Sequence, residues 1–161
     1  MGLDMYLSKR TYVKNWDHMQ KEEKHRVYVS KNGKSVSHIK PKRVAYIIEE
    51  VLYWRKANHI HKWFVDNVQK GVDDCGTYYV EMEKLKQLRD LCKDVIERKG
   101  DSTNAPRVLP TQSGFFFGGT EYDKYYYDDT QRTLETLDEL IKEHEEIEGS
   151  WKPDYEYHAS W

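Results

Sequence analysis

The sequence of 161 residues has the length of one ordinary domain, and its composition excludes several classes of protein. Only two cysteines are present, Cys75 and Cys92, which excludes a disulfide scaffold and a four-cysteine zinc module. No apolar run approaches the length of about 18 residues that a spanning helix needs, and residues 1–20 lack the apolar segment of a signal peptide. We therefore expect a protein of the reducing cytoplasm that does not enter a membrane.

The charge is distributed unevenly along the chain, although the net charge is only −2. Residues 1–120 carry a net charge of +7, and residues 121–161 carry a net charge of −9. This asymmetry predicts either an acidic helix and tail beside a basic body, or a basic surface open to a phosphate-bearing ligand. Proteins that bind duplex nucleic acid are normally far more basic, so we expect no duplex partner. Aliphatic residues are few, but aromatic residues make up 14% of the chain and can supply much of the core.

The first third of the chain predicts strands. An alternating pattern favours a strand over residues 3–13, with three apolar side chains on one face: Leu3, Met5 and Leu7. A polar loop is expected at 16–24. An Asn-Gly pair then predicts a type I′ hairpin turn between two short strands, and the segments concerned are 26–30, Asn32-Gly33 and 34–39.

Residues 44–54, after Pro41, are ambiguous. Four apolar residues fit helical spacing, namely Val44, Ile47, Ile48 and Val51, but the run is also rich enough in β-branched residues to form a strand. We favour a helix over 42–51.

Three further helices are predicted from apolar stripes, at 55–70, 83–98 and 125–147. Gly71 and Gly100 follow the first two helices, where a glycine commonly ends a helix.

The segments between these helices are shorter. We expect an extended piece at 78–80, a loop at 100–113 that contains Pro106 and Pro110, and a short buried strand at 115–117. The predicted fold class is α+β: a small antiparallel sheet with an N-terminal hairpin, covered by three to four helices. We expect a single domain over 1–148, and a mobile acidic and aromatic C-terminal tail over 149–161.

The segment 53–64 contains the most unusual combination of residues in the chain. On a helix, an apolar arc would include His61 and would carry Asn58 at its edge, whereas Arg55, His59, Lys62 and Asp66 would face the other way. A buried His61 requires hydrogen-bond partners, either as a core residue or as part of a pocket floor. His59 and His61 diverge by about 200° on a helix, so we expect no metal site.

The two cysteines and the glycine-containing segment 109–123 indicate function less clearly. Cys75 follows two aspartates, but no signature of a cysteine enzyme surrounds it, and Cys92 lies on the apolar stripe of its helix. Residues 109–123 contain glycines on both sides of three phenylalanines, without the spacing of a Walker or Rossmann phosphate loop. The same segment offers Gln112, Tyr122 and Tyr126 for hydrogen bonding and stacking.

Three stretches together resemble a family of small proteins from bacteriophage and prophage genomes: MGLDMYL at 1–7, YWRKAN-IH-WF at 53–64 and LPTQSGFFFG at 109–118. The resemblance extends from residue 1 to about residue 140. It implies an accessory protein that works in the cytoplasm of the bacterial host, on host metabolism or host defence. It implies no activity and no catalytic or binding residues.

Three classes of function fit these observations. The first is the binding of a small phosphorylated or nucleotide-type ligand, which would sequester a host signal. The second is a protein that binds and modulates a host factor, and the third is a small enzyme with His61 as its acid or base. We expect no cofactor, and a second copy of the chain is a further candidate partner.

For the first class we predict a pocket where the helix that contains 54–61 meets the segment 112–126. The candidate ligand-binding residues are Arg55, Lys56, Asn58, His61, Gln112, Tyr122 and Tyr126. Arginine and lysine suit a phosphate, tyrosines suit a planar ring, and the amides and the imidazole suit its polar edges.

Overall fold

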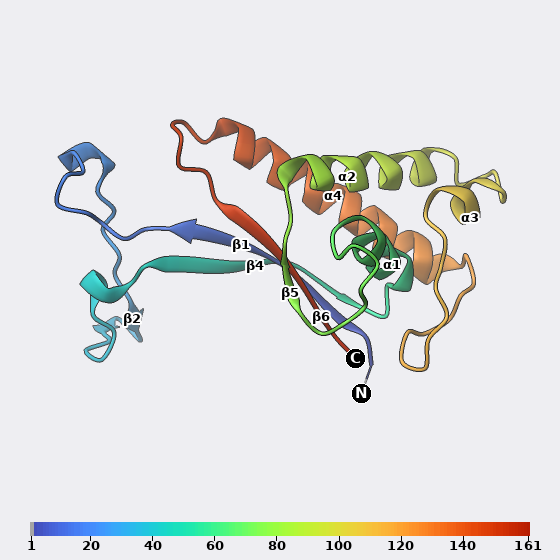
Figure 1. The fold of residues 1–161 in the computed structure, drawn as a ribbon, viewed down its shortest axis with the longest axis horizontal. Coiled ribbons are helices and arrows are strands. Elements are labelled where there is room, and N and C mark those ends of the chain that lie inside the picture. The colour runs from blue at the N-terminus through green and yellow to red at the C-terminus, as the bar shows by residue number, and fades with distance from the viewer. Residues whose placement is uncertain (1) are drawn as a thin grey trace.

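The computed structural model describes residues 2–161, and its centre is a four-stranded antiparallel sheet (Figure 1). The strands are β1 (Asp4–Tyr12), β4 (Tyr46–Arg55), β5 (Thr77–Tyr79) and β6 (Asp154–Ser160). Their spatial order is β4-β1-β6-β5. β1 pairs with β4 along its whole length, and β6 inserts between β1 and β5. The middle of the sheet therefore joins the two ends of the sequence.

Four helices accompany this sheet: α1 (Asn58–Asn67), α2 (Met82–Glu97), α3 (Asn104–Val108) and α4 (Lys124–Glu146). α2 and α4 run side by side, and α1 follows directly after β4 (Figure 1). The predicted α+β class is confirmed, and the helices expected at 83–98 and 125–147 are displaced by only one residue. None of these helices has both the length and the apolar character that crossing a bilayer requires.

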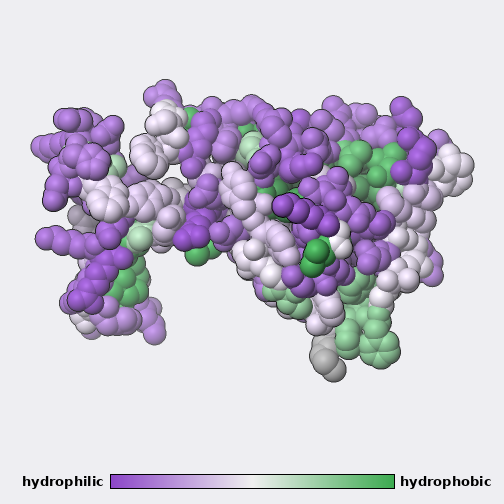
Figure 2. Space-filling model, viewed as in Figure 1, coloured by the Kyte–Doolittle hydropathy of each residue, from purple (hydrophilic) through white to green (hydrophobic). Residues whose placement is uncertain are grey.

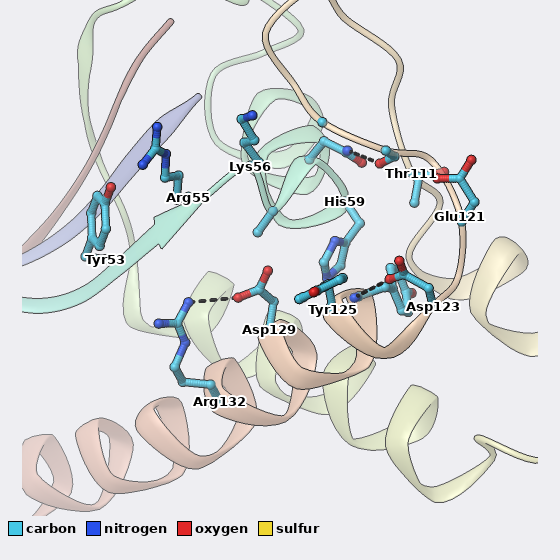
Figure 3. A pocket seen from close by; sticks show the side chains of 15 residues that line it. Tyr53, Arg55, Lys56, His59, Thr111, Glu121, Asp123, Tyr125, Asp129 and Arg132 are labelled. Carbon is cyan, nitrogen blue, oxygen red and sulfur yellow. Dashed lines mark hydrogen bonds and ion pairs between the residues drawn. The ribbon is translucent and has the colours of Figure 1, made fainter. Parts of the chain in front are cut away.

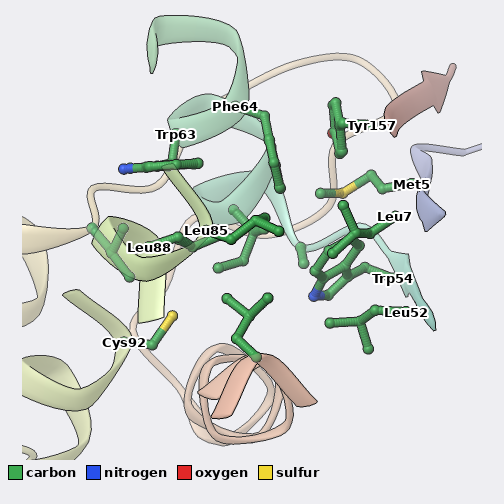
Figure 4. Packing of buried hydrophobic residues seen from close by; sticks show 14 of the residues in the cluster. Met5, Leu7, Leu52, Trp54, Trp63, Phe64, Leu85, Leu88, Cys92 and Tyr157 are labelled. Carbon is green, nitrogen blue, oxygen red and sulfur yellow. The ribbon is translucent and has the colours of Figure 1, made fainter. Parts of the chain in front are cut away.

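The core lies between one face of the sheet and the helices (Figure 4). Alternate residues of β1, β4 and β6 point into it and are fully or almost fully buried: Met5, Leu7, Leu52, Trp54, Tyr155, Tyr157 and Ala159. α2 contributes Leu85, Leu88 and Cys92 to the same cluster, and α4 contributes Leu137. Each fully buried large apolar side chain stabilises the fold by about 1.5–3 kcal/mol. The aromatic rings thus supply the core that the few aliphatic residues do not.

The helix predicted over 42–51 is wrong. Residues 41–43 form one 3₁₀ turn, and residues 46–55 form β4, which pairs with β1 from Tyr46 to Arg55. Ile47 and Ile48, which suggested an apolar helix stripe, are exposed on the strand. The ladder of backbone hydrogen bonds to β1 outweighs the helical spacing of these residues.

Three other boundaries differ from the sequence prediction. α1 begins at Asn58 rather than at residue 55, because Arg55 still belongs to β4. The loop expected at 100–113 contains the short helix α3, which tolerates Pro106 because a first-turn N–H needs no helical partner. The strand expected at 115–117 is a turn in which Phe117 is buried and Phe115 is 94% exposed.

The prediction of a mobile tail over 149–161 is also wrong for most of these residues. Residues 154–160 form β6, which like β1 has a neighbouring strand on both sides. Tyr155, Tyr157 and Ala159 alternate with more exposed residues and fill the core. Pairing on both edges and burial of two tyrosines hold this segment in place.

Residues 14–43 form a projection that we call the arm, which extends from the outer ends of β1 and β4 (Figure 1). It contains a 3₁₀ turn at Lys21–Glu23 and a small hairpin of β2 (Ser30–Lys31) and β3 (Lys34–Ser35). The predicted type I′ turn is confirmed, because Asn32 and Gly33 have φ angles of 50° and 72°. The hairpin strands are only two residues long, shorter than expected.

A buried histidine ties α1 to β6. His61 is completely buried, as predicted, and both of its ring nitrogens have partners. Nδ1 lies 2.8 Å from the Tyr157 hydroxyl, and Nε2 lies 3.1 Å from Oδ1 of Asp73. Because a carboxylate only accepts hydrogen bonds, Nε2 donates to Asp73, and the Tyr157 hydroxyl donates to Nδ1. Burial lowers the pKa of His61, while Asp73 opposes that shift. The imidazole is thus a satisfied part of the core.

Replacing Tyr157 with Phe removes the hydroxyl group that donates to His61. We expect the free energy of unfolding to fall by about 1–3 kcal/mol, because a buried imidazole nitrogen loses its partner. Urea unfolding followed by tryptophan fluorescence measures this change. The control is Tyr79→Phe at a tyrosine that is 61% exposed, which should change stability by less than about 0.5 kcal/mol. Equal stability of the two variants would contradict a stabilising role for this hydrogen bond.

Candidate functional site

A pocket of about 470 Å³ lies where the end of β4, the start of α1, the loop 109–123 and the start of α4 meet (Figure 3). This volume is within the range of small-molecule sites. Its walls carry three cationic, three acidic and three tyrosine side chains: Arg55, Lys56, Arg132, Glu121, Asp123, Asp129, Tyr53, Tyr125 and Tyr126. The location is the junction that the sequence predicted, between the segments 54–61 and 112–126.

Lys56 has a strained backbone at the junction of β4 and α1. Its φ angle is +61°, in the left-handed region that a non-glycine residue adopts at a cost of about 1–3 kcal/mol. Its N–H donates to the carbonyl of Leu3 over 2.8 Å, and its own carbonyl accepts from Asn58 N–H over 2.9 Å. A Cβ on Gly118 would lie only 3.1 Å from the Lys56 Cβ. The glycine therefore allows the loop to close against the strained residue.

Asn58 fixes the loop that forms one wall of the pocket. Its Nδ2 donates to the carbonyls of Phe117 and Gly119 over 2.9 and 2.8 Å, and its Oδ1 accepts from the backbone N–H of Gln112 over 3.0 Å. The side chain is 2% exposed. Because both amide protons and the oxygen have partners, Asn58 positions the loop and is not available to read a ligand.

The charged residues of the pocket fall into two groups. Arg132 is paired with Asp129 over 2.8 Å, and Asp123 caps α4 by accepting from Tyr126 N–H over 3.1 Å. Arg55 and Lys56 are exposed and make no ion pair within residues 2–161. Figure 3 places these two cations on one side of the pocket and Glu121 and Asp123 on the other. The pocket is thus bipolar, and its basic side is uncompensated.

His59, which the sequence placed on the face of the helix opposite the apolar arc, is buried at the floor of the pocket. The side chain is 3% exposed and packs against Tyr126 of α4, with the two ring centroids 4.1 Å apart. Nε2 lies 3.0 Å from the Thr130 hydroxyl, which donates its own proton to the Tyr126 carbonyl over 2.7 Å. The hydroxyl can therefore only accept from His59, so Nε2 carries the proton and Nδ1 is a bare acceptor. Burial lowers the pKa of His59 to about 3.

Burial also affects Asp129. It raises the pKa of this carboxyl group, and the neighbouring Arg132 partly reverses that shift. Desolvated carboxyl groups beside a concave surface are common at functional sites, although structural ion pairs produce the same effect.

The structure brings four of the seven predicted site residues to the pocket: Arg55, Lys56, Asn58 and Tyr126. The other three do not line it. His61 is occupied by Tyr157 and Asp73, Gln112 meets Asn58 through its backbone, and the Tyr122 hydroxyl accepts from Thr111 N–H over 3.2 Å. Tyr126 is 4% exposed and donates to the carbonyl of Leu109.

Five further residues line the pocket without having been predicted from the sequence: Tyr53, His59, Tyr125, Asp129 and Arg132. Polar residues inside the apolar stripe of α4, such as Thr130, were the signal that a buried partner faced this helix.

We find no family model, curated protein or solved structure that matches this chain. Residues 2–161 bring together no group of three or more His, Cys, Asp or Glu side chains that could hold a metal ion.

Asn58→Ala removes three buried hydrogen bonds at once. We expect the free energy of unfolding to fall by about 1–3 kcal/mol and the amides of residues 112–120 to exchange faster with deuterium, because two carbonyls and one N–H lose their partner. Hydrogen exchange with mass spectrometry measures the second effect. The control is Asn67→Ala, which removes a single bond from Nδ2 to Trp63 within α1 and should leave the loop unchanged. Unchanged exchange in Asn58→Ala would contradict the positioning role.

His59 predicts how stability depends on pH. Its pKa is lowered from 6.5 to about 3 in the folded state, so below pH 6.5 the unfolded chain binds a proton that the folded chain does not. This contribution to stability is complete above pH 6.5 and is lost at up to about 1.4 kcal/mol per pH unit as the pH falls toward 3. We expect His59→Gln to reduce the slope of stability against pH by about one proton, measured by urea unfolding between about pH 6.5 and 5. The same substitution at the exposed His38 should keep the wild-type slope; equal slopes for both variants would contradict the assignment.

Proposed function

We propose that the pocket binds a small, phosphorylated, ring-containing metabolite of the nucleotide type. The observation that carries this proposal is the pair of exposed cations, Arg55 and Lys56, at the edge of a concave site without a carboxylate partner. A phosphate group is the ligand chemistry that complements a guanidinium and an ammonium group side by side.

Backbone groups support a phosphate in the same place. Gly118 and Gly119 line the pocket, and their N–H groups make no hydrogen bond within residues 2–161. Gly118 has a φ angle of +85° and packs against Lys56, which keeps this turn beside the cations. Free N–H groups in a tight turn form a small anion-binding concavity.

The opposite side of the pocket suits a planar ring with hydrogen-bond donors. Tyr125 is 77% exposed, so its ring has a face available for stacking, whereas the half-buried Tyr53 lies on the side of Arg55 (Figure 3). Glu121 and Nδ1 of His59 offer acceptors, which match the amino and imino groups of a purine base. A ligand with phosphate at one end and a donor-bearing base at the other fits the bipolar charge of the site.

The biological role that we infer is sequestration of a nucleotide-type signal by an accessory protein. Its phage origin and its action in the host cytoplasm are hypotheses that rest on the family resemblance. The enzyme alternative built on His61 has no support in the geometry, because both ring nitrogens are engaged and the side chain is fully buried.

Calorimetry with a panel of nucleotides and cyclic nucleotides tests the proposal. We expect at least one ligand to bind more tightly than about 100 μM, and Arg55→Ala or Lys56→Gln to weaken it about 10-fold or more, because each loses a charge-assisted hydrogen bond. The matched control is Lys62→Gln on the other face of α1, where the lysine is paired with Asp66. This function would be overturned if no ligand of the panel bound, or if both the Arg55 and the Lys56 variant bound the ligand as tightly as the wild type. Either result would favour a protein partner.

A further inference from the structure

The arm is strongly basic, although the net charge of the whole chain is slightly negative. Residues 14–43 contain nine Lys and Arg and three Asp and Glu, a net charge of +6, although the whole chain has a net charge of −2. Figure 1 shows the arm standing away from the body, and Figure 2 shows that its visible surface is mainly hydrophilic. An elongated basic projection is a surface that attracts polyanions.

The cations of the arm are not balanced within the molecule. Thirteen ion pairs of lysine or arginine with a carboxylate connect side chains of residues 2–161, and none of them includes a lysine or arginine of the arm. In the hairpin, Lys31 lies directly opposite Lys34. Like charges in a cross-strand pair destabilise a hairpin, so this arrangement costs free energy until an anion lies against it.

Packing does not explain the arm either. No residue between 14 and 43 is buried, and the exposed side chains include Tyr28, at 81%, and Trp16, at 50%. The loops are held by polar contacts, such as the two bonds of 2.8 Å between Asn15 and the backbone of His25. Large aromatic side chains left in solvent on a basic surface indicate a partner that stacks on them.

An aromatic groove lies at the base of the arm. It has a volume of about 690 Å³ and three aromatic side chains in its walls: Tyr12, Trp16 and Trp151. Tyr12 and Trp151 lie nearly parallel, with ring centroids 6.5 Å apart, and the Lys14 ammonium is 5.5 Å from the Trp16 ring centroid. Glu23 and Glu148 also line the groove, and their carboxylates would repel a phosphate group bound there. The groove suits a planar base, and the arm beyond it suits the phosphates.

We propose that the arm and this groove bind single-stranded nucleic acid. Free cations along the arm contact the backbone, and the rings of Trp16, Trp151 and Tyr28 stack on bases. Stacking of this kind requires bases that are not already paired and stacked in a duplex, so the surface selects single strands over duplexes. Every base presents an aromatic face, and the binding is therefore tolerant of sequence. This site lies beyond the end of α4, whereas the pocket lies at the start of that helix, and it does not depend on the function proposed for the pocket.

Fluorescence anisotropy with a labelled oligothymidylate and with a duplex of the same length tests this proposal. We expect the single strand to bind more tightly, with an affinity that falls steeply between about 50 and 200 mM salt. The triple variant Lys31→Glu, Lys34→Glu, Lys42→Glu should weaken binding about 10-fold or more and reduce the salt slope by about 2, at about 0.7 per lost phosphate contact. Trp16→Ala and Tyr28→Ala should each weaken binding about 5-fold or more. These variants change exposed side chains, so the body should unfold as in the wild type.

The matched control replaces three exposed lysines of the body by the same charge change: Lys93→Glu, Lys99→Glu, Lys142→Glu. It should keep most of the affinity of the wild type. Equal loss in the two triple variants, equal binding of duplex and single strand, or no binding at low salt would overturn the proposal. Light scattering of the protein alone tests whether a second copy of the chain binds the arm. If the wild type self-associates at low salt and the arm variant does not, the arm binds the acidic surface of a second copy instead.

Discussion

The insertion of β6 between β1 and β5 is the constraint on which the rest of the structure depends. β5 has no other neighbour in the sheet, and β1 would otherwise have one unpaired edge. Tyr157 of this strand stacks on Phe64 of α1 with ring centroids 3.9 Å apart, and its hydroxyl bonds to His61. α1 is therefore fixed to the sheet through a strand from the far end of the sequence. The position of the pocket at the start of α1 therefore depends on that contact.

Sequence patterns were informative where one face of an element is apolar. The alternation of Met5 and Leu7 predicted β1, and the leucines of α2 predicted that helix to within a residue. β4 was misassigned because its β-branched residues, such as Ile48, are exposed on a strand and happen to follow helical spacing. β6 was missed because its inward residues are tyrosines and an alanine rather than aliphatic residues. Its alternation with period two was nevertheless present in the sequence.

The candidate site was predictable as a junction of two segments but not in its detail. Arg55 and Lys56 were identified by residue type, whereas the role of Asn58 depends on three backbone partners that only the folded loop supplies. The burial of His59 was not predicted, because helical phase indicates which face of a helix a residue occupies and not whether that face is covered. Net charge summed over long stretches of sequence also failed to locate the basic surface. Sums over long stretches gave a basic body, while the structure confines most of that charge to the arm.

The pairing of Asp4 with Ser160 brings the two ends of the sheet's central strands together, and Figure 1 shows the chain ends at the same edge. A short linker could therefore join them, and the chain could be opened within the arm, where no side chain is buried. In such a circular permutant β6 would directly precede β1 as a hairpin. The contact between β1 and β6 would become local, whereas the pairing of β1 with β4, which the arm now connects, would span almost the entire chain. One partner of β1 is thus distant in sequence in either strand order, so we expect the permutant to form the same sheet without folding faster.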